Sequence, residues 1–235
     1  RTALAPEPAA AQGAETDADL KRALMMAAIA AGEKPNPRAL GKQVKGILAG
    51  REIRGTLAAI QAAGGSARYV SVNVTDRAGI QAAMDQVRND WGPITGLVHG
   101  AGVIADKEIA RKPVDDFAWV FDVKIGGLRA LLDATAGDPL KVLVMFASVA
   151  ARCGNNGQSD YAMANEVLNK VAEAERRRRG GLCLVKSLGW GPWEGGMVSP
   201  QLKARFEQMG VALIPLDVGA QMMVDELRGS SPTQV

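Results

Sequence analysis

Short apolar runs and helical stretches alternate along the chain from about residue 67 to residue 188, and this alternation constrains the fold more than any other feature. A doubly wound parallel sheet produces such a pattern, because each buried strand needs a crossover, usually a helix, to reach the next parallel strand. The sequence therefore predicts an α/β, Rossmann-like fold. The expected strands are 67–74, 95–99, 141–147 and 184–188. The expected helices are 77–90, 114–136 and 161–178, preceded by 20–32 and 38–63.

Four polar residues stand where this fold gathers its ligands. Ser148 follows the apolar run 142–146, which places its hydroxyl at the carboxyl end of a buried strand, where open α/β sheets bind ligands. Tyr161 and Asn165 are four residues apart in a helical stretch, so both project from one helical face. Lys124 interrupts an apolar stretch, where a lysine costs desolvation unless it has a use.

These residue types suit hydride transfer to a ketone. A phenol titrates near pH 10, and the ammonium of Lys124 would lower the pKa of Tyr161 toward the working range. Ser148 would hydrogen-bond the carbonyl oxygen as negative charge develops, and Asn165 would orient the lysine or hold a water that replaces the delivered proton. The structural alternatives are an amphipathic tyrosine at a helix start, a snorkelling surface lysine and a serine that caps a turn.

The order of these residues resembles the short-chain dehydrogenase/reductases. Among them it is most similar to the ketoreductase domains of modular polyketide synthases and polyketide-type polyunsaturated fatty acid synthases. The commoner members carry tyrosine and lysine four apart with asparagine on the preceding helix, whereas these ketoreductases exchange the two, as Lys124 and Asn165 do here. Other matching segments are 92–96, 99–102, 154–158 and 190–197.

The resemblance implies NADPH as the cofactor and assigns residues around it. The guanidinium of Arg1 would pair with the 2′-phosphate, the backbone at 99–102 would approach the adenosine side, and the loop 190–197 would wrap the nicotinamide. The alternatives are a plain tight turn and a rigid aromatic loop. The implied cofactor-binding residues are Arg1, Asn73, Val74, His99, Gly100, Ala101, Gly102, Gly191, Pro192, Trp193 and Met197. The implied substrate-facing residues are Asp106, Gln158 and Trp190.

One expected motif is missing from the sequence. The glycine-rich fingerprint that follows the first strand of a dinucleotide-binding fold occurs nowhere in the chain. We therefore expect a doubly wound sheet that lacks its first βαβ segment. The expected domains are an N-terminally truncated loop and helical insertion at 1–50, and the ketoreductase catalytic domain at 51–235.

Composition excludes several other classes of protein. The net charge is only +3, and the basic run 176–179 favours a solvated helix end over a nucleic-acid site. Two cysteines and one histidine predict neither a disulfide framework nor a metal site, and they favour a reducing, cytoplasmic compartment. No apolar run reaches the roughly 18 residues of a membrane span.

The resemblance implies an NADPH-dependent 3-ketoacyl reductase that acts on a chain tethered to an acyl carrier protein, beside neighbouring synthase domains. Asp106 and Cys153 stand at positions where the family's patterns favour a 3R alcohol. The rival hypothesis is a non-catalytic structural module of such a synthase, which the missing glycine loop allows. A free-standing reductase of small alcohols or steroids is disfavoured by the exchanged lysine and asparagine.

Overall fold

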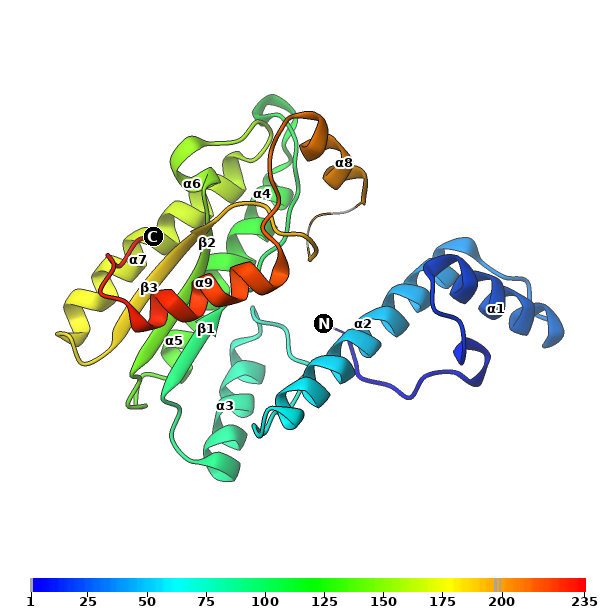
Figure 1. Ribbon diagram of the computed structural model, residues 1–235, viewed down its shortest axis with the longest axis horizontal. Helices are drawn as coiled ribbons and strands as arrows, with labels where there is room; N and C mark the ends of the chain where they lie inside the picture. The colour runs from blue at the N-terminus through cyan, green and yellow to red at the C-terminus, as the bar shows by residue number, and fades with distance from the viewer. Residues whose placement is uncertain (1, 197, 199) are drawn as a thin grey trace. The chain divides into compact units, whose positions relative to one another are not determined.

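The computed structural model describes residues 2–196, 198 and 200–235 (Figure 1). They form two compact units that divide between Asn73 and Val74. The boundary expected at residue 50 falls inside a helix that runs from Pro37 to Ala62, and the division into an insertion and a catalytic domain stays a prediction.

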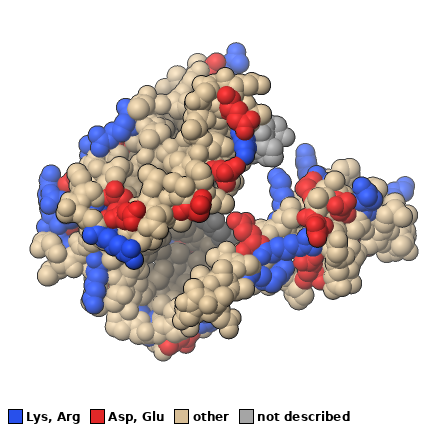
Figure 2. Space-filling model, in the orientation of Figure 1, with Lys and Arg blue, Asp and Glu red and all other residues tan. Residues whose placement is uncertain are grey.

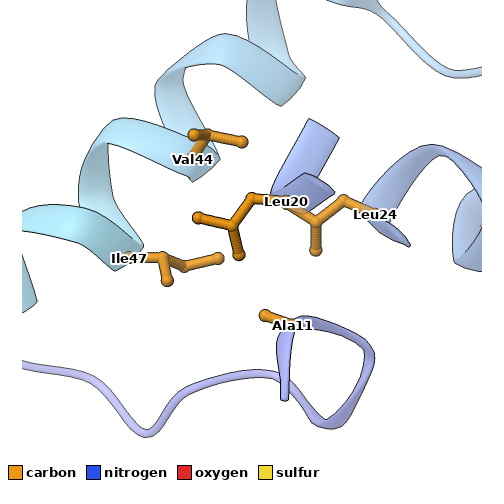
Figure 3. Packing of buried hydrophobic residues seen from close by; sticks show 5 residues of the cluster. All are labelled: Ala11, Leu20, Leu24, Val44 and Ile47. Carbon is orange, nitrogen blue, oxygen red and sulfur yellow. The ribbon is translucent and has the colours of Figure 1, made fainter. Parts of the chain in front are cut away.

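The first unit, residues 1–73, is helical and has a core of its own. Its elements are η1 (Ala9–Ala11), α1 (Asp17–Ala30) and α2 (Pro37–Ala62). The side chains of Thr16 and Asn36 accept hydrogen bonds from backbone N–H groups of the first turns of α1 and α2, which satisfies donors that a helix start leaves open. Side chains from all three elements meet in the core (Figure 3), which comprises Ala11, Leu20, Leu24, Val44 and Ile47.

The second unit, residues 74–235, is built on a parallel sheet. Its strands are β1 (Gly96–His99), β2 (Val142–Ser148) and β3 (Leu184–Trp190), in the order β1-β2-β3. The register places Gly96 opposite Val142, and Val142 opposite Leu184. Helix α9 crosses one face of the sheet, and α5 and α7 cover the other (Figure 1). This arrangement confirms the predicted α/β, Rossmann-like class.

The helices of the second unit follow the predicted alternation with the strands. They are α3 (Arg77–Trp91), α4 (Val114–Phe121), α5 (Gly127–Ala134), α6 (Ala150–Cys153), α7 (Ser159–Arg179), α8 (Pro200–Gln208) and α9 (Leu216–Arg228). The buried core under them is aliphatic, as expected for parallel strands covered on both faces. Its fully buried members include Val120, Leu143, Val144, Met145, Leu168 and Ala172.

Two expectations from the sequence are wrong in detail. Residues 67–74 form no strand, because a strand needs a hydrogen-bonding neighbour and none of the described strands pairs with this segment. The helix expected at 114–136 ends at Ala134 and contains a π-helical turn, η3 (Asp122–Gly126), between α4 and α5. Such turns occur mostly as single insertions in helices and often lie at functional sites.

The last residues of the chain extend the sheet beyond β3. Gln234 pairs in parallel with Ser187, and the amide N–H of Ser187 donates to the carbonyl of Thr233 at 2.7 Å. The buried ammonium of Lys186 holds the preceding turn by donating to the carbonyl oxygens of Ser231 at 2.7 Å and Pro232 at 3.2 Å.

Surface charge is mixed on the face seen in Figure 2, where basic and acidic side chains are interspersed. None of the helices in the described ranges is long and apolar enough to cross a membrane.

Candidate active site

The carboxyl ends of the strands bring the predicted residues to one edge of the sheet. Ser148 is the last residue of β2 and lies opposite Trp190, the last residue of β3. His99 ends β1 and lies opposite Met145. Parallel strands present their carboxyl ends on the same side, which is where this fold binds ligands.

Tyr161 and Asn165 lie one turn apart near the start of α7, as their spacing predicts. The side-chain Nδ2 of Asn165 donates to the carbonyl oxygen of Tyr161 at 2.7 Å. Asn165 is fully buried, and its Oδ1 has no hydrogen-bond partner among the described residues. A buried amide oxygen of this kind is ready to accept a proton donor such as a water or an ammonium.

Lys124 sits in the π-helical turn η3 and is buried, not a snorkelling surface lysine. Its Nζ donates to the carbonyl oxygen of Phe146 at 2.7 Å and lies 5.5 Å from the centre of the Tyr161 ring. Burial lowers the pKa of Lys124 from 10.5 to about 8, since the charged form loses solvation. Nε2 of His99 hydrogen-bonds the carbonyl oxygen of Lys124 at 2.8 Å, as expected of a buried packing histidine.

The pKa of Tyr161 moves in the opposite direction from the one expected. Burial raises it above its ordinary value of 10, and the negative charge of Asp106 adds to the rise. Hydrogen bonds with the side chains of Ser148 and Asn165 oppose this shift. The phenol is therefore protonated at neutral pH, because desolvation sets the direction of the shift.

Two of the three predicted substrate-facing residues contact one another. Nε2 of Gln158 donates to Oδ2 of Asp106 at 2.9 Å, and Nδ2 of Asn155 donates to Oε1 of Gln158 at 3.0 Å. Gln158 is buried and immediately precedes α7, whereas Asp106 is exposed. This chain of amides and a carboxylate links the segment around Asp106 to the helix that carries Tyr161.

The third, Trp190, belongs to an aromatic cluster at the carboxyl end of β3. Its ring lies 5.8 Å from that of Phe146 and 4.8 Å from that of Trp193, in an edge-to-face contact. Its indole Nε1 is buried and has no hydrogen-bond partner in the described part of the chain. The loop is anchored through Ile214, whose N–H donates to the carbonyl of Pro192 at 2.8 Å.

Two glycines of the segment after β1 pack closely against neighbouring side chains of the site. At Gly102 a Cβ atom would stand 3.2 Å from Cε of Lys124, and at Gly100 it would stand 3.8 Å from the Phe146 ring. A side chain at Gly102 would therefore crowd the predicted catalytic lysine, and one at Gly100 would contact the Phe146 ring. The residues present fit the nicotinamide end of a dinucleotide, while the sequence offers no glycine-rich phosphate loop.

The remaining predicted cofactor residues have different surroundings. Val74 is buried, and its methyl groups occupy the space beside Gly127. Asn73 is exposed, and Gly191 lies beside Ile214. Arg1 and Met197 lie outside the described residues.

Comparison with known proteins identifies the family. Residues 40–195 match the KR domain. The chain belongs to the ketoreductase domain family. It is 44% identical over 218 residues to one polypeptide of the polyunsaturated fatty acid synthase of Thraustochytrium sp., covering 92% of this chain and 8% of that polypeptide. The chain thus spans less than a tenth of the length of this relative.

Solved ketoreductase structures share the fold. A ketoreductase domain from the bacillaene assembly line superposes with a TM-score of 0.68 at 27% identity, over 77% of this chain and 45% of that one. A short-chain dehydrogenase from Burkholderia cenocepacia, determined in complex with NADP, matches with a TM-score of 0.67 over 77% of this chain and 79% of its own. At 22% identity the second match shows the fold alone. The predicted family is therefore confirmed.

The structure also brings in residues that sequence reasoning passed over. Asn155 orients Gln158 through a side-chain hydrogen bond. A buried ion pair joins Lys112 to Asp160, which immediately precedes Tyr161 in the sequence. The only signal in the sequence was a charged residue adjacent to the predicted catalytic tyrosine.

Proposed function

We propose that this ketoreductase domain reduces a 3-ketoacyl thioester, carried on an acyl carrier protein, to the 3-hydroxyacyl thioester with NADPH. The observation that carries the proposal is the convergence on Tyr161 of a buried ammonium, a strand-end hydroxyl and a buried amide. Lys124 lies 5.5 Å from the ring, Ser148 ends strand β2 at this site, and Asn165 donates to the backbone carbonyl of Tyr161.

Each residue has a defined part in this reaction. NADPH, when bound, supplies the hydride to the β-carbon of the substrate. The phenol of Tyr161 donates the proton to the carbonyl oxygen, and its raised pKa keeps that proton in place at neutral pH. Ser148 hydrogen-bonds the same oxygen as negative charge develops on it. The charge of Lys124 stabilises the phenolate that remains, and Asn165 holds the path by which a proton returns.

The cofactor would lie along the segment after β1 and under the aromatic loop after β3. Gly100, Ala101 and Gly102 would let it approach Lys124 closely, and Trp193 would cover the nicotinamide. A nicotinamide cofactor suits the match with the NADP-bound dehydrogenase, and Arg1 would select NADPH through the 2′-phosphate.

The proposed setting is a large multidomain synthase in the cytoplasm. The relative from Thraustochytrium is one polypeptide of such a synthase, and two unpaired cysteines suit a reducing compartment. Neighbouring synthase domains and an acyl carrier protein would be the partners. Asp106 and Gln158, which contact each other, would face the substrate and favour the 3R alcohol.

The second candidate function is a structural module of the same kind of synthase that catalyses nothing. The missing glycine fingerprint favours it for this stretch of sequence. A test is NADPH oxidation with a 3-ketoacyl thioester surrogate, comparing this chain with one extended upstream by about 60 residues, enough for a βαβ unit. Activity in the extended chain supports reduction, while a folded but inactive extended chain supports the structural module.

A further inference from the structure

A buried ion pair joins the segment that carries Asp106 to the start of α7. Nζ of Lys112 lies 2.8 Å from Oδ2 of Asp160, and the two side chains are only 3% and 1% exposed. Taking two charges out of water costs several kcal/mol per ion, so a buried pair has to be compensated by its surroundings.

Backbone groups on both sides of the pair offset part of this desolvation cost through hydrogen bonds. Lys112 also donates to the carbonyl oxygen of Ala105 at 2.7 Å, and Oδ1 of Asp160 accepts from the N–H of Tyr161 at 2.9 Å. Apart from this ion pair, Oδ2 of Asp160 has no polar partner in the described part of the chain, so the ammonium of Lys112 compensates its charge. One ion pair thus connects the backbone of Ala105 with that of Tyr161.

The same two segments meet at two further points. Gln158 donates to Asp106 at 2.9 Å, and the backbone N–H of Lys107 donates to the carbonyl of Gly157 at 3.0 Å. Asp106 lies between the two backbone attachments at Ala105 and Lys107. Its carboxylate is therefore held at a fixed place relative to the phenol of Tyr161.

We infer that Lys112 and Asp160 form a positioning pair, which sets substrate binding by holding Asp106 against the start of α7. This inference rests on the proposed function, since it assigns Asp106 to the substrate. Neither side chain touches the reacting atoms: Asp160 contacts only the backbone of Tyr161, and the pair reaches the substrate through Asp106. A misplacement of a reacting group by about 1 Å can cost a reaction on the order of 10²-fold in rate.

The chain supplies a matched control for the pair. Lys107 forms an ion pair with Asp116 at the same distance of 2.8 Å, from the same segment, but with side chains 49% and 32% exposed. An exposed pair contributes little to stability or position, because water competes for both charges. Replacing Lys107 by methionine keeps the backbone bond to Gly157 and removes only this outer contact.

The experiment measures steady-state reduction of a 3-ketoacyl thioester surrogate by the complete ketoreductase domain. We expect Lys112→Met to raise KM for the thioester about tenfold or more and to leave KM for NADPH unchanged. Lys112→Arg, which keeps the charge, should bring KM for the thioester most of the way back to the parent value. Lys107→Met should leave both constants unchanged. In an Asp106→Ala background, Lys112→Met should add less than about twofold to KM, since effects that act through one residue are not additive. Losses that multiply in the double variant would overturn the inference.

Hydrogen exchange of the Lys107 amide gives a readout that does not need turnover. We expect Lys112→Met to speed exchange at this amide, and Asp160→Asn, which keeps the shape of the side chain, to do so to a smaller extent. An inactive parent domain with this response would refute the proposed reduction but keep the coupling of the two segments. Unchanged exchange in both variants would refute the positioning pair, whatever the activity.

Discussion

The ammonium of Lys124 lies over the ring of Tyr161, 5.5 Å from its centre, while it donates to the carbonyl of Phe146 at 2.7 Å. Both side chains are largely buried, and burial moves the two pKa values in opposite directions, toward the neutral form of each group. The structure therefore holds a protonated phenol beside a lysine that loses its charge easily.

Changing Tyr161 to phenylalanine should remove ketone reduction and little else. The ring and its contact with Lys124 stay, while the proton donor is lost, so we expect kcat to fall by about 10²–10⁴-fold. NADPH affinity, measured by fluorescence titration of the complete domain, should stay nearly unchanged. A phenylalanine variant with full activity would refute the catalytic assignment.

The pH dependence of reduction should report the charge of Lys124. Its pKa is lowered to about 8, whereas that of Tyr161 is raised, so the lysine loses its proton first as the pH rises. We expect the single-turnover rate of reduction to fall as the pH passes through about 8. The rate of the Lys124→Met variant should be low and independent of pH across this range. The rate of the Lys124→Arg variant should not fall near pH 8, because the guanidinium keeps its charge. An unchanged alkaline limb in the methionine variant would assign it to another group.

Lys186 should stabilise the second unit through the turn at Ser231. Its buried ammonium donates to that residue's carbonyl and hydroxyl oxygens, and replacement by methionine leaves them without this donor. We expect the free energy of unfolding to fall by ~2 kcal/mol, the range for hydrogen bonds to a charged group. The control is Lys170→Met, whose ion pair with Glu166 is exposed, and it should cost less than about 0.5 kcal/mol in urea denaturation. Equal losses in the two variants would contradict this role.

Gly219 should be required by the aromatic cluster after β3. A Cβ atom there would overlap the indole ring of Trp193. Gly219→Ala should displace Trp193 from Trp190 and lower stability by about 1–3 kcal/mol, with a change in tryptophan fluorescence. At Gly137 a Cβ would meet nothing within 4 Å, so Gly137→Ala should change neither signal. Identical fluorescence in the two variants would show that the indole does not fill this space.

The sequence predicted most of the fold because helical periodicity and apolar runs are local signals. The strands at β1, β2 and β3 and the helices α1, α2, α3 and α7 lie within a few residues of their expected positions. Residues 67–74 have the same apolar character as a strand but form none, since strand formation depends on a neighbour that the local sequence does not encode. The π-helical turn at Lys124 has no sequence signature of its own.

The candidate site was predictable in its residue types but not in its electrostatics. Spacing placed Tyr161 and Asn165 on one face of a helix, and the strand end placed Ser148. The direction of the pKa shift at Tyr161 depends on how deeply the ring is buried, which spacing does not determine. The partnership of Lys112 with Asp160 joins residues 48 positions apart, so it emerged only from the folded chain.

The register of the sheet has a consequence for the order of folding. Gly96 pairs with Val142, and Val142 pairs with Leu184. Each strand pairing therefore requires closure of a loop of more than roughly 40 residues, and the entropy of that closure is lost before the hydrogen bonds form. The core of the first unit instead joins neighbouring helices through Leu20 and Val44. Because non-local pairing slows folding, the core of the helical unit should form early. Pairing of the parallel strands should then limit the rate at which the candidate active site forms.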